Sequence, residues 1–167
     1  MVRLIDRREN GHPKEWTAPF YINEINFEPY LREAMKIFHG FGYLTVLVTN
    51  QPDVAYGYLT QRHWERIFAA TLREIRPNYV YWCPHTRADQ CDCKKPKPGM
   101  LRRAAIEHRI NLKHSFMIGD TENDMLAGKR AGCKTILIRR AYNKDNAEAN
   151  NNADFVVNSL LEAAAIV

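Results

Sequence analysis

Residues 115–138 read SFMIGDTENDMLAGKRAGCKTILI, and this stretch decides the fold. A short apolar run ends in Gly119-Asp120, a helical pattern follows, and a second apolar run covers residues 135–138. The pattern predicts a βαβ unit in which Asp120 follows the carboxyl end of a buried strand. Ligands of an open α/β sheet bind beyond that end, where a carboxylate is placed to hold a hard cation such as Mg²⁺. Asp120 could instead complement the dipole of the next helix, which Thr121 and Asp124 begin with a near capping box.

The rest of the chain alternates between strand and helix patterns. Apolar, β-branched runs predict strands, and apolar residues at spacings of three and four predict helices. The predicted strands cover residues 44–49, 79–82 and 155–157, and the predicted helices cover residues 29–40, 60–72, 100–108 and 160–165. This alternation indicates an α/β fold, a Rossmann-like three-layer sandwich with a central parallel sheet. The Asn-rich segment 143–152 is predicted to be a mobile loop.

Composition and charge limit the class of protein. The chain has 167 residues and a net charge of +5, which suits an anionic small substrate. No long block of like charges is present, so nucleic acid is not an expected partner. The pairs Arg7-Arg8, Arg102-Arg103 and Arg139-Arg140 are isolated and are expected to be solvated. No apolar run reaches the about 18 residues of a membrane span, and no signal-peptide pattern opens the chain, so we expect a cytoplasmic monomer without membrane contact.

A cluster of cysteine and histidine predicts a metal site. Cys83, His85, Cys91 and Cys93 form a C-x-H-x5-C-x-C array. Four sulfur and nitrogen ligands with no open position describe a closed, structural zinc site, and ordinary buried thiols are the alternative. Cys133 lies outside the array and is expected to be a small buried hydrophobe.

Three motifs make the chain resemble the haloacid-dehalogenase (HAD) superfamily of phosphatases. They are VTNQPDVAYG at residues 48–57, CPHTRADQCDCKKPKPGM at residues 83–100 and MIGDTENDMLAGKRAGC at residues 117–133. The chain is most similar to the branch of zinc-containing heptose-bisphosphate phosphatases and their histidinol-phosphatase relatives. The resemblance implies one HAD-like domain over residues 1–167. It also implies hydrolysis of a small phosphorylated metabolite, a sugar phosphate or a histidinol-phosphate-like compound, through an aspartyl-phosphate.

The resemblance also implies a phosphate site. In the family, a Thr or Ser, the residue after it and a Lys hold the phosphate oxygens. Carried over, Thr49 and Asn50 bind phosphate, and Lys95 neutralises its charge during transfer, with Lys94 nearby. Phosphoryl transfer needs mainly positioning and charge neutralisation, which these groups supply. A solvated charge at Lys95 and a strand-end hydroxyl that satisfies a turn at Thr49 are the structural alternatives.

The implied magnesium site combines Asp120, supported by Asp124, with the first motif of the family. That motif is an apolar strand followed by Asp-x-Asp-Gly-Thr, whose first Asp attacks phosphorus and whose second is the general acid. The candidate in this chain is residues 4–10, with Asp6 as nucleophile and the backbone carbonyl of Arg8 as a further Mg²⁺ ligand. Arg8 stands at the position of the acid, and loss of a general acid typically costs about 10² to 10⁴ in rate.

Two explanations of this first motif compete. In one, the motif is degenerate and Asp6 still acts. In the other, the nucleophile strand is absent and residues 1–11 are a loop that follows its position. Arg3, a charged residue within the short apolar run 2–5, favours this second explanation. The family-like spacing from Asp6 to Thr49 favours the first, which we take as the expectation. The alternative to a Mg²⁺-dependent phosphatase is a non-catalytic HAD-like module that binds a phosphorylated ligand or a protein partner.

Two substitutions bear on the substrate. Tyr56 and Thr121 stand where some relatives carry Arg and Lys. Both changes remove positive charge near the expected site, which argues against a bisphosphate substrate.

Overall fold

The computed structural model describes residues 2–10 and 15–167. Its elements are β1 (Ile5–Asp6), the 3₁₀-helix η1 (Arg8–Asn10), β2 (Trp16–Thr17), the 3₁₀-helix η2 (Ile22–Glu24), α1 (Leu31–Gly40), β3 (Val46–Asn50), α2 (Gln61–Ile75), β4 (Tyr79–Cys83), α3 (Gly99–His108), the 3₁₀-helix η3 (Leu112–His114), β5 (Phe116–Gly119), α4 (Glu122–Ala131), β6 (Lys134–Ile138), α5 (Ala147–Asn151), β7 (Phe155–Val157) and α6 (Leu160–Ala164). No helix in the described ranges is long and apolar enough to cross a membrane.

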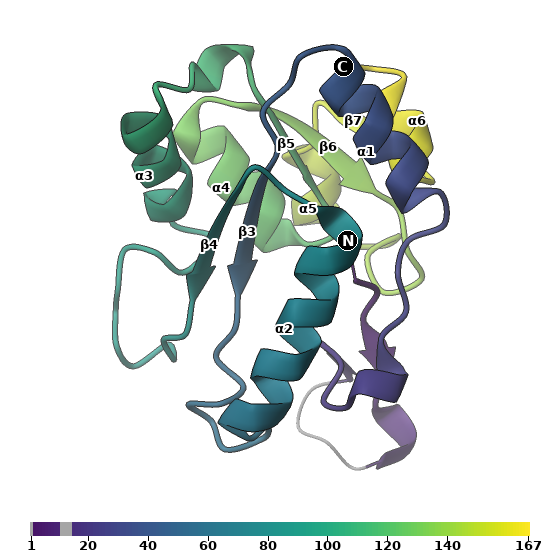
Figure 1. Cartoon of the computed structure of the whole chain (residues 1–167), viewed down its shortest axis with the longest axis vertical. Helices are drawn as coiled ribbons and strands as arrows, with labels where there is room; N and C mark the ends of the chain where they lie inside the picture. Colours follow the sequence, from purple (N-terminus) through teal and green to yellow (C-terminus); the bar gives the residue numbers. More distant parts are fainter. Residues whose placement is uncertain (1, 11–14) are drawn as a thin grey trace.

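Five strands lie between two layers of helices, in the order β4, β3, β5, β6, β7 across the molecule (Figure 1). On β6, Ile136 and Ile138 pack in a core with α1, α6 and the end of α2. Leu137 packs on the opposite face, in a core with α4 and α5. Successive side chains of a strand point to opposite faces, so an uninterrupted apolar run places core on both sides of β6. The predicted α/β fold with parallel strands is confirmed.

The parallel strands form two separate blocks. β3 pairs with β4 in parallel, with Val46 opposite Tyr79 and Asn50 opposite Cys83. β6 pairs in parallel with β5 on one side and β7 on the other. Within the described residues, no strand is hydrogen-bonded between β3 and β5. The expected single central sheet is therefore divided at its centre.

The unit β5–α4–β6 forms as its local sequence predicts. Thr121 is the N-cap of α4 and makes a complete capping box with Asp124, and Gly132 ends the helix at φ 87°. A Cβ on Gly119 would lie 2.3 Å from the Cβ of Asp124, so only glycine lets the start of α4 approach the end of β5 this closely. A Cβ on Gly128 would likewise lie 2.6 Å from the Cβ of Met117.

The N-terminal segment is not part of the parallel sheet. β1 pairs antiparallel with β2 in a two-residue ladder, with Ile5 opposite Thr17 and Asp6 opposite Trp16. Arg7 follows β1 and is 8% exposed. The run before Asp6 therefore does not form a buried parallel strand of the kind that carries the first motif of the family.

Two expectations about polar segments are wrong. Arg7 and Arg140 are not solvated, because their guanidinium groups bind buried or half-buried carboxylates, those of Glu24 and Glu28. Segment 143–152 is not an unstructured loop, because it contains α5 and begins with Asn143, which is only 3% exposed.

Candidate active site and metal loop

The carboxyl ends of β3 and β5 and the chain that follows β4 meet at one cavity of about 960 Å³. This is the edge of a parallel sheet at which ligands bind. Among the residues that line it are Thr49, Asn50, Lys94, Lys95, Asp120, Thr121 and Asp124. The structure thus brings the expected phosphate-binding residues together with Asp120 and Asp124.

Lys95 is fixed rather than solvated. Its backbone N–H donates to Oδ1 of Asn50 over 3.0 Å, and Nδ2 of Asn50 donates back to the carbonyl of Lys95 over 3.0 Å. Its Nζ donates to the carbonyl of Val48 over 3.0 Å and to Oδ1 of Asp124 over 2.5 Å. The side chain is 12% exposed. These contacts hold one ammonium at the end of β3, on the wall of the cavity.

Asp124 is buried and ionised. Burial raises its pKa, but the charge of Lys95, its hydrogen bond and those from Thr121 more than offset this and leave the pKa below its ordinary value. Oδ2 accepts hydrogen bonds from the N–H and the hydroxyl of Thr121 over 3.1 and 2.7 Å. Asp124 therefore completes the capping box in the first turn of α4 and holds Lys95, and Thr121 is the N-cap.

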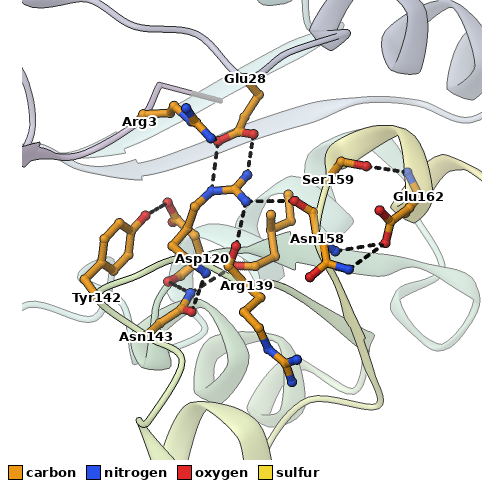
Figure 2. Close-up of polar contacts among 11 residues, drawn as sticks. Arg3, Glu28, Asp120, Arg139, Tyr142, Asn143, Asn158, Ser159 and Glu162 are labelled. Carbon is orange, nitrogen blue, oxygen red and sulfur yellow. Dashed lines mark hydrogen bonds and ion pairs between the residues drawn. The ribbon is translucent and has the colours of Figure 1, made fainter.

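Asp120 carries the unusual carboxylate of the site. Burial first, and then the nearby charge of Asp124, raise its pKa to about 6. The hydroxyl of Tyr142 donates to Oδ2 of Asp120 (Figure 2). Asn143 donates from Nδ2 to the backbone carbonyls of Asp120 and Ile138 over 2.8 and 2.9 Å. The turn after β6 thus orients the half-buried carboxylate of Asp120 on the wall of the cavity.

A buried ion-pair network supports that turn. Glu28, whose side chain is 2% exposed, accepts from Arg140 at both carboxylate oxygens and from Arg3 over 3.3 Å (Figure 2). The backbone N–H of Arg140 donates to Oδ1 of Asn143 over 2.7 Å. Sequence reasoning missed Tyr142, Asn143, Arg140 and Glu28. Arg140, Tyr142 and Asn143 follow β6, which pairs with β5, and this position is the signal that could have found these three residues.

Other expected residues have more local partners. Oγ1 of Thr49 accepts from Nε2 of Gln51 over 3.0 Å. Nζ of Lys94 donates to the carbonyl of His85 over 2.8 Å, so the Lys94 side chain points toward the metal loop, residues 83–93. The hydroxyl of Tyr56 accepts from the backbone N–H of Arg87 over 3.2 Å.

Asp6 and Arg8 lie apart from this arrangement. Asp6 is on the β1–β2 hairpin with its side chain 39% exposed, and it accepts from the backbone N–H of Arg8 over 3.1 Å and from the Arg8 guanidinium. These hydrogen bonds lower the pKa of Asp6. The guanidinium of Arg8 also lies 5.5 Å from the ring centre of Trp16. The structure does not bring either residue into the lining of the cavity with Thr49, Lys95 and Asp120.

The predicted zinc ligands converge. One ligand atom each from Cys83, His85, Cys91 and Cys93 lies within 4.8 Å of all the others. Neighbouring ligand atoms are 3.1 to 3.6 Å apart. Ligands at zinc bond lengths would lie about 3.4 to 3.8 Å from one another in a tetrahedron, so the cluster fits a tetrahedral metal with small adjustment. Cys133 is buried and lies outside the cluster, as expected.

The loop that carries these ligands is fixed by main-chain contacts. Nζ of Lys97 donates to the carbonyls of Gln90 and Cys91 over 2.9 and 2.8 Å. A Cβ on Gly99 would lie 2.2 Å from the carbonyl oxygen of Asp92, so the start of α3 fits under the loop only as glycine.

Comparison with known proteins gives consistent matches. The HAD-hydrolase-like family model matches residues 92–163. D-glycero-beta-D-manno-heptose-1,7-bisphosphate 7-phosphatase of Haemophilus ducreyi is 34% identical over 153 residues, 84% of this chain and 84% of the relative. The Escherichia coli enzyme of the same name is 34% identical over 157 residues, 85% of this chain and 82% of the relative.

Solved structures share the fold. D,D-heptose 1,7-bisphosphate phosphatase from B. bronchiseptica, complexed with magnesium and phosphate, superimposes with a TM-score of 0.76 at 24% identity, over 88% of this chain and 86% of that one. A putative HAD-like phosphatase from Mesorhizobium loti has a TM-score of 0.65 at 27% identity, over 87% of this chain and 77% of that one.

Proposed function

The chain belongs to the HAD-like hydrolases, among the heptose-bisphosphate phosphatases, and on this premise we propose that its cavity binds and hydrolyses the phosphate ester of a sugar bisphosphate. The proposal departs from the expectation based on Tyr56 and Thr121, because the names of the relatives favour a bisphosphate. Thr49 and Asn50 bind phosphate oxygens, and Lys95 neutralises the charge of the phosphoryl group as it is transferred. Asp120 supplies a magnesium ligand.

One observation carries the proposal: Thr49, Lys95 and Asp120 come from three separate strands or their following loops and line one cavity. Lys95 is already desolvated and oriented by Asn50 and Asp124, so little reorganisation accompanies phosphate binding. Preorganised charge in a water-poor site contributes strongly to phosphoryl transfer.

The donor chemistry at Asp120 fits a magnesium ion. Its carboxylate is half-buried, lies near the negative charge of Asp124 and has a pKa raised to about 6, so a nearby cation would offset an unfavourable charge. Hard oxygen donors are the ligands that Mg²⁺ selects, and it usually completes its shell with water and substrate phosphate. When bound, Mg²⁺ would neutralise phosphate charge, while Tyr142 and Asn143 keep Asp120 aimed at the site.

The cluster Cys83, His85, Cys91 and Cys93 would hold a structural zinc ion. All four positions are protein ligands, which leaves no open position for substrate. In this proposal zinc fixes the loop beside Lys94 and Lys95. None of the four cysteines forms a disulfide, which suits a reducing compartment, and we assign the protein to the cytoplasm.

The test is phosphate release by the purified chain with Mg²⁺. The panel contains D-glycero-beta-D-manno-heptose 1,7-bisphosphate, its monophosphates and histidinol phosphate, with EDTA and the Asp120→Asn variant as controls. Mg²⁺-dependent release that Asp120→Asn abolishes supports the proposal, and preference for the bisphosphate supports the substrate class. Neither release nor binding of any member of the panel would contradict it.

A second function, binding of a phosphorylated ligand without turnover, is favoured by one observation. Asp6 pairs with Arg8 on the exposed hairpin and lies outside the cavity lining, so it stays outside the proposed machinery. Calorimetric binding of the bisphosphate without release of phosphate by this chain would select this function.

A further inference from the structure

The carboxylate of Asp120 is held through one of its two oxygens. The hydroxyl of Tyr142 donates to Oδ2 (Figure 2). Among the described residues, no hydrogen-bond donor reaches Oδ1, and Asp120 lies in the wall of the cavity. The terminal torsion of an aspartate is broad and two-fold, so an unrestrained carboxylate samples many orientations. The phenol of Tyr142 therefore selects which oxygen of Asp120 is left for a ligand.

Tyr142 acts through Asp120 rather than on a ligand. In the part of the chain that the structure describes, Asp120 lines the cavity and neither Tyr142 nor Asn143 does. Asn143 holds the main chain of the same aspartate, because its Nδ2 donates to the carbonyl of Asp120 over 2.8 Å. The turn after β6 thus holds Asp120 at both its side chain and its backbone.

Arg140 anchors this turn to a distant part of the chain. Its guanidinium donates to both carboxylate oxygens of Glu28, 112 residues away in sequence, and the two side chains are 10% and 2% exposed. The same guanidinium donates to the carbonyl of Asn158, after β7, over 2.9 Å. The backbone N–H of Arg140 donates to Oδ1 of Asn143 over 2.7 Å (Figure 2). A planar fork on a carboxylate fixes direction as well as distance, so Glu28 sets the path of the turn.

The N-terminal segment makes a second contact with the turn. The ring centres of Trp16 and Tyr142 lie 5.0 Å apart, with the rings inclined at 47°. Trp16 belongs to β2, which pairs with β1. Arg3 donates to Glu28 over 3.3 Å. The segment in which the first motif was expected therefore packs against the turn that orients Asp120.

We infer that Tyr142 and Glu28 are positioning residues for magnesium binding at Asp120, an inference that rests on the proposed function. Tyr142 engages Oδ2 and leaves Oδ1 for the ion, and Glu28 holds the turn through Arg140. Hydrogen-bond partners of a metal ligand orient it, and loss of such a partner typically costs about 10- to 100-fold in metal affinity or activity. Glu28 does not line the cavity, so its effect on the ion passes through the turn.

Magnesium affinity tests the role of Tyr142. Tyr142→Phe keeps the ring beside Trp16 and removes the hydroxyl, so Mg²⁺ titrated into the purified chain should bind about tenfold more weakly by calorimetry. Binding of inorganic phosphate in EDTA, which depends on Lys95, should be unchanged, whereas a distorted cavity would lose both ligands. Tyr81→Phe is the matched control, because the hydroxyl of Tyr81 also donates to a carboxylate, that of Glu107, and lies outside the cavity lining.

A double-mutant cycle tests the role of Glu28. Glu28→Gln keeps the shape of the side chain and removes its charge, so it should also weaken Mg²⁺ binding by about tenfold. Because Glu28 acts through the same turn as Tyr142, the combined variant should bind Mg²⁺ no more weakly than the weaker single variant. If Glu28→Gln does not fold, Arg140→Lys takes its place in the cycle, because it keeps the positive charge and loses the planar fork. Losses that simply multiply would overturn the role of Glu28.

Phosphate release separates this inference from the proposed function. At saturating Mg²⁺, release by Tyr142→Phe should return close to the parent rate, because the phenol contacts the metal ligand and not the substrate. Weaker Mg²⁺ binding by Tyr142→Phe, in a chain that releases no phosphate from any member of the panel, would support the inference and contradict the phosphatase proposal. Unchanged Mg²⁺ affinity with release retained would overturn the inference and leave the phosphatase intact. No Mg²⁺ binding by the parent, or joint loss of Mg²⁺ and phosphate binding in Tyr142→Phe, would overturn it as well.

Discussion

Nζ of Lys95 lies 2.5 Å from Oδ1 of Asp124, and both side chains are nearly closed to solvent, with 12% and 7% of their surfaces exposed. Removal of one partner from a buried ion pair leaves the other charge buried without compensation. We therefore expect Asp124→Asn to lower the free energy of unfolding by about 3 to 5 kcal/mol, measured by urea denaturation. The double variant Lys95→Met with Asp124→Asn should recover part of the loss. A loss below about 1 kcal/mol for Asp124→Asn, the range of a surface pair, would contradict the pairing.

Asp120 should lower the stability of the metal-free protein. Its folded-state pKa is about 6 against an ordinary 3.8, so the folded chain binds the proton more tightly than the unfolded chain does. Stability should therefore fall as the pH rises from about 4 to about 6, with the full penalty above that window. In EDTA at pH 7, Asp120→Asn should be more stable than the parent by about 1 to 3 kcal/mol while losing Mg²⁺-dependent phosphate release. Equal stability of the two proteins at pH 7 and at pH 4 would contradict the raised pKa.

Features whose determinants are close in sequence could be predicted. The unit around α4 follows from two apolar runs, a capping box and Gly132, all within residues 115–138. The metal loop follows from the C-x-H-x5-C-x-C array between Cys83 and Cys93, whose four sulfur and nitrogen ligands match a tetrahedral metal. The convergence of Thr49, Lys95 and Asp120 on one cavity follows from the geometry of parallel strands, because their carboxyl ends share one edge.

Features that depend on partners distant in the sequence could not be predicted from it. The short run before Asp6 is compatible with a parallel or an antiparallel strand, and its antiparallel pairing with Trp16 and Thr17 decided the outcome. Asn143 looked like part of a solvated loop because its partners, the carbonyls of Ile138 and Asp120, are set by the fold. The division of the sheet is likewise a property of strand order, which local periodicity does not encode.

Gly119 should tolerate no side chain. A Cβ there would lie 2.3 Å from Cβ and 2.6 Å from Cγ of Asp124, the first-turn residue that also holds Lys95. Gly119→Ala should therefore lower the melting temperature and displace Asp124, reducing phosphate binding measured by calorimetry. Gly40→Ala is the matched control, because a Cβ at Gly40, in the last turn of α1, would have no atom within 4 Å. Equal effects of the two substitutions would contradict the close approach of α4 to β5.

The metal loop should stabilise the protein without taking part in the chemistry. Cys91 and Cys93 must release their protons to bind zinc, so strong chelators or a pH well below neutral should remove the metal and lower the melting temperature. Metal analysis of the purified protein should give about one zinc per chain, and X-ray absorption should give sulfur at about 2.3 Å and nitrogen at about 2.0 to 2.1 Å. Cys91→Ala should lower the melting temperature and leave the pH dependence of phosphate release largely unchanged, because all four ligand positions belong to the protein. Cys133→Ala, which removes a buried thiol outside the cluster, is the control and should retain the zinc. Full zinc content in Cys91→Ala would contradict the ligand assignment.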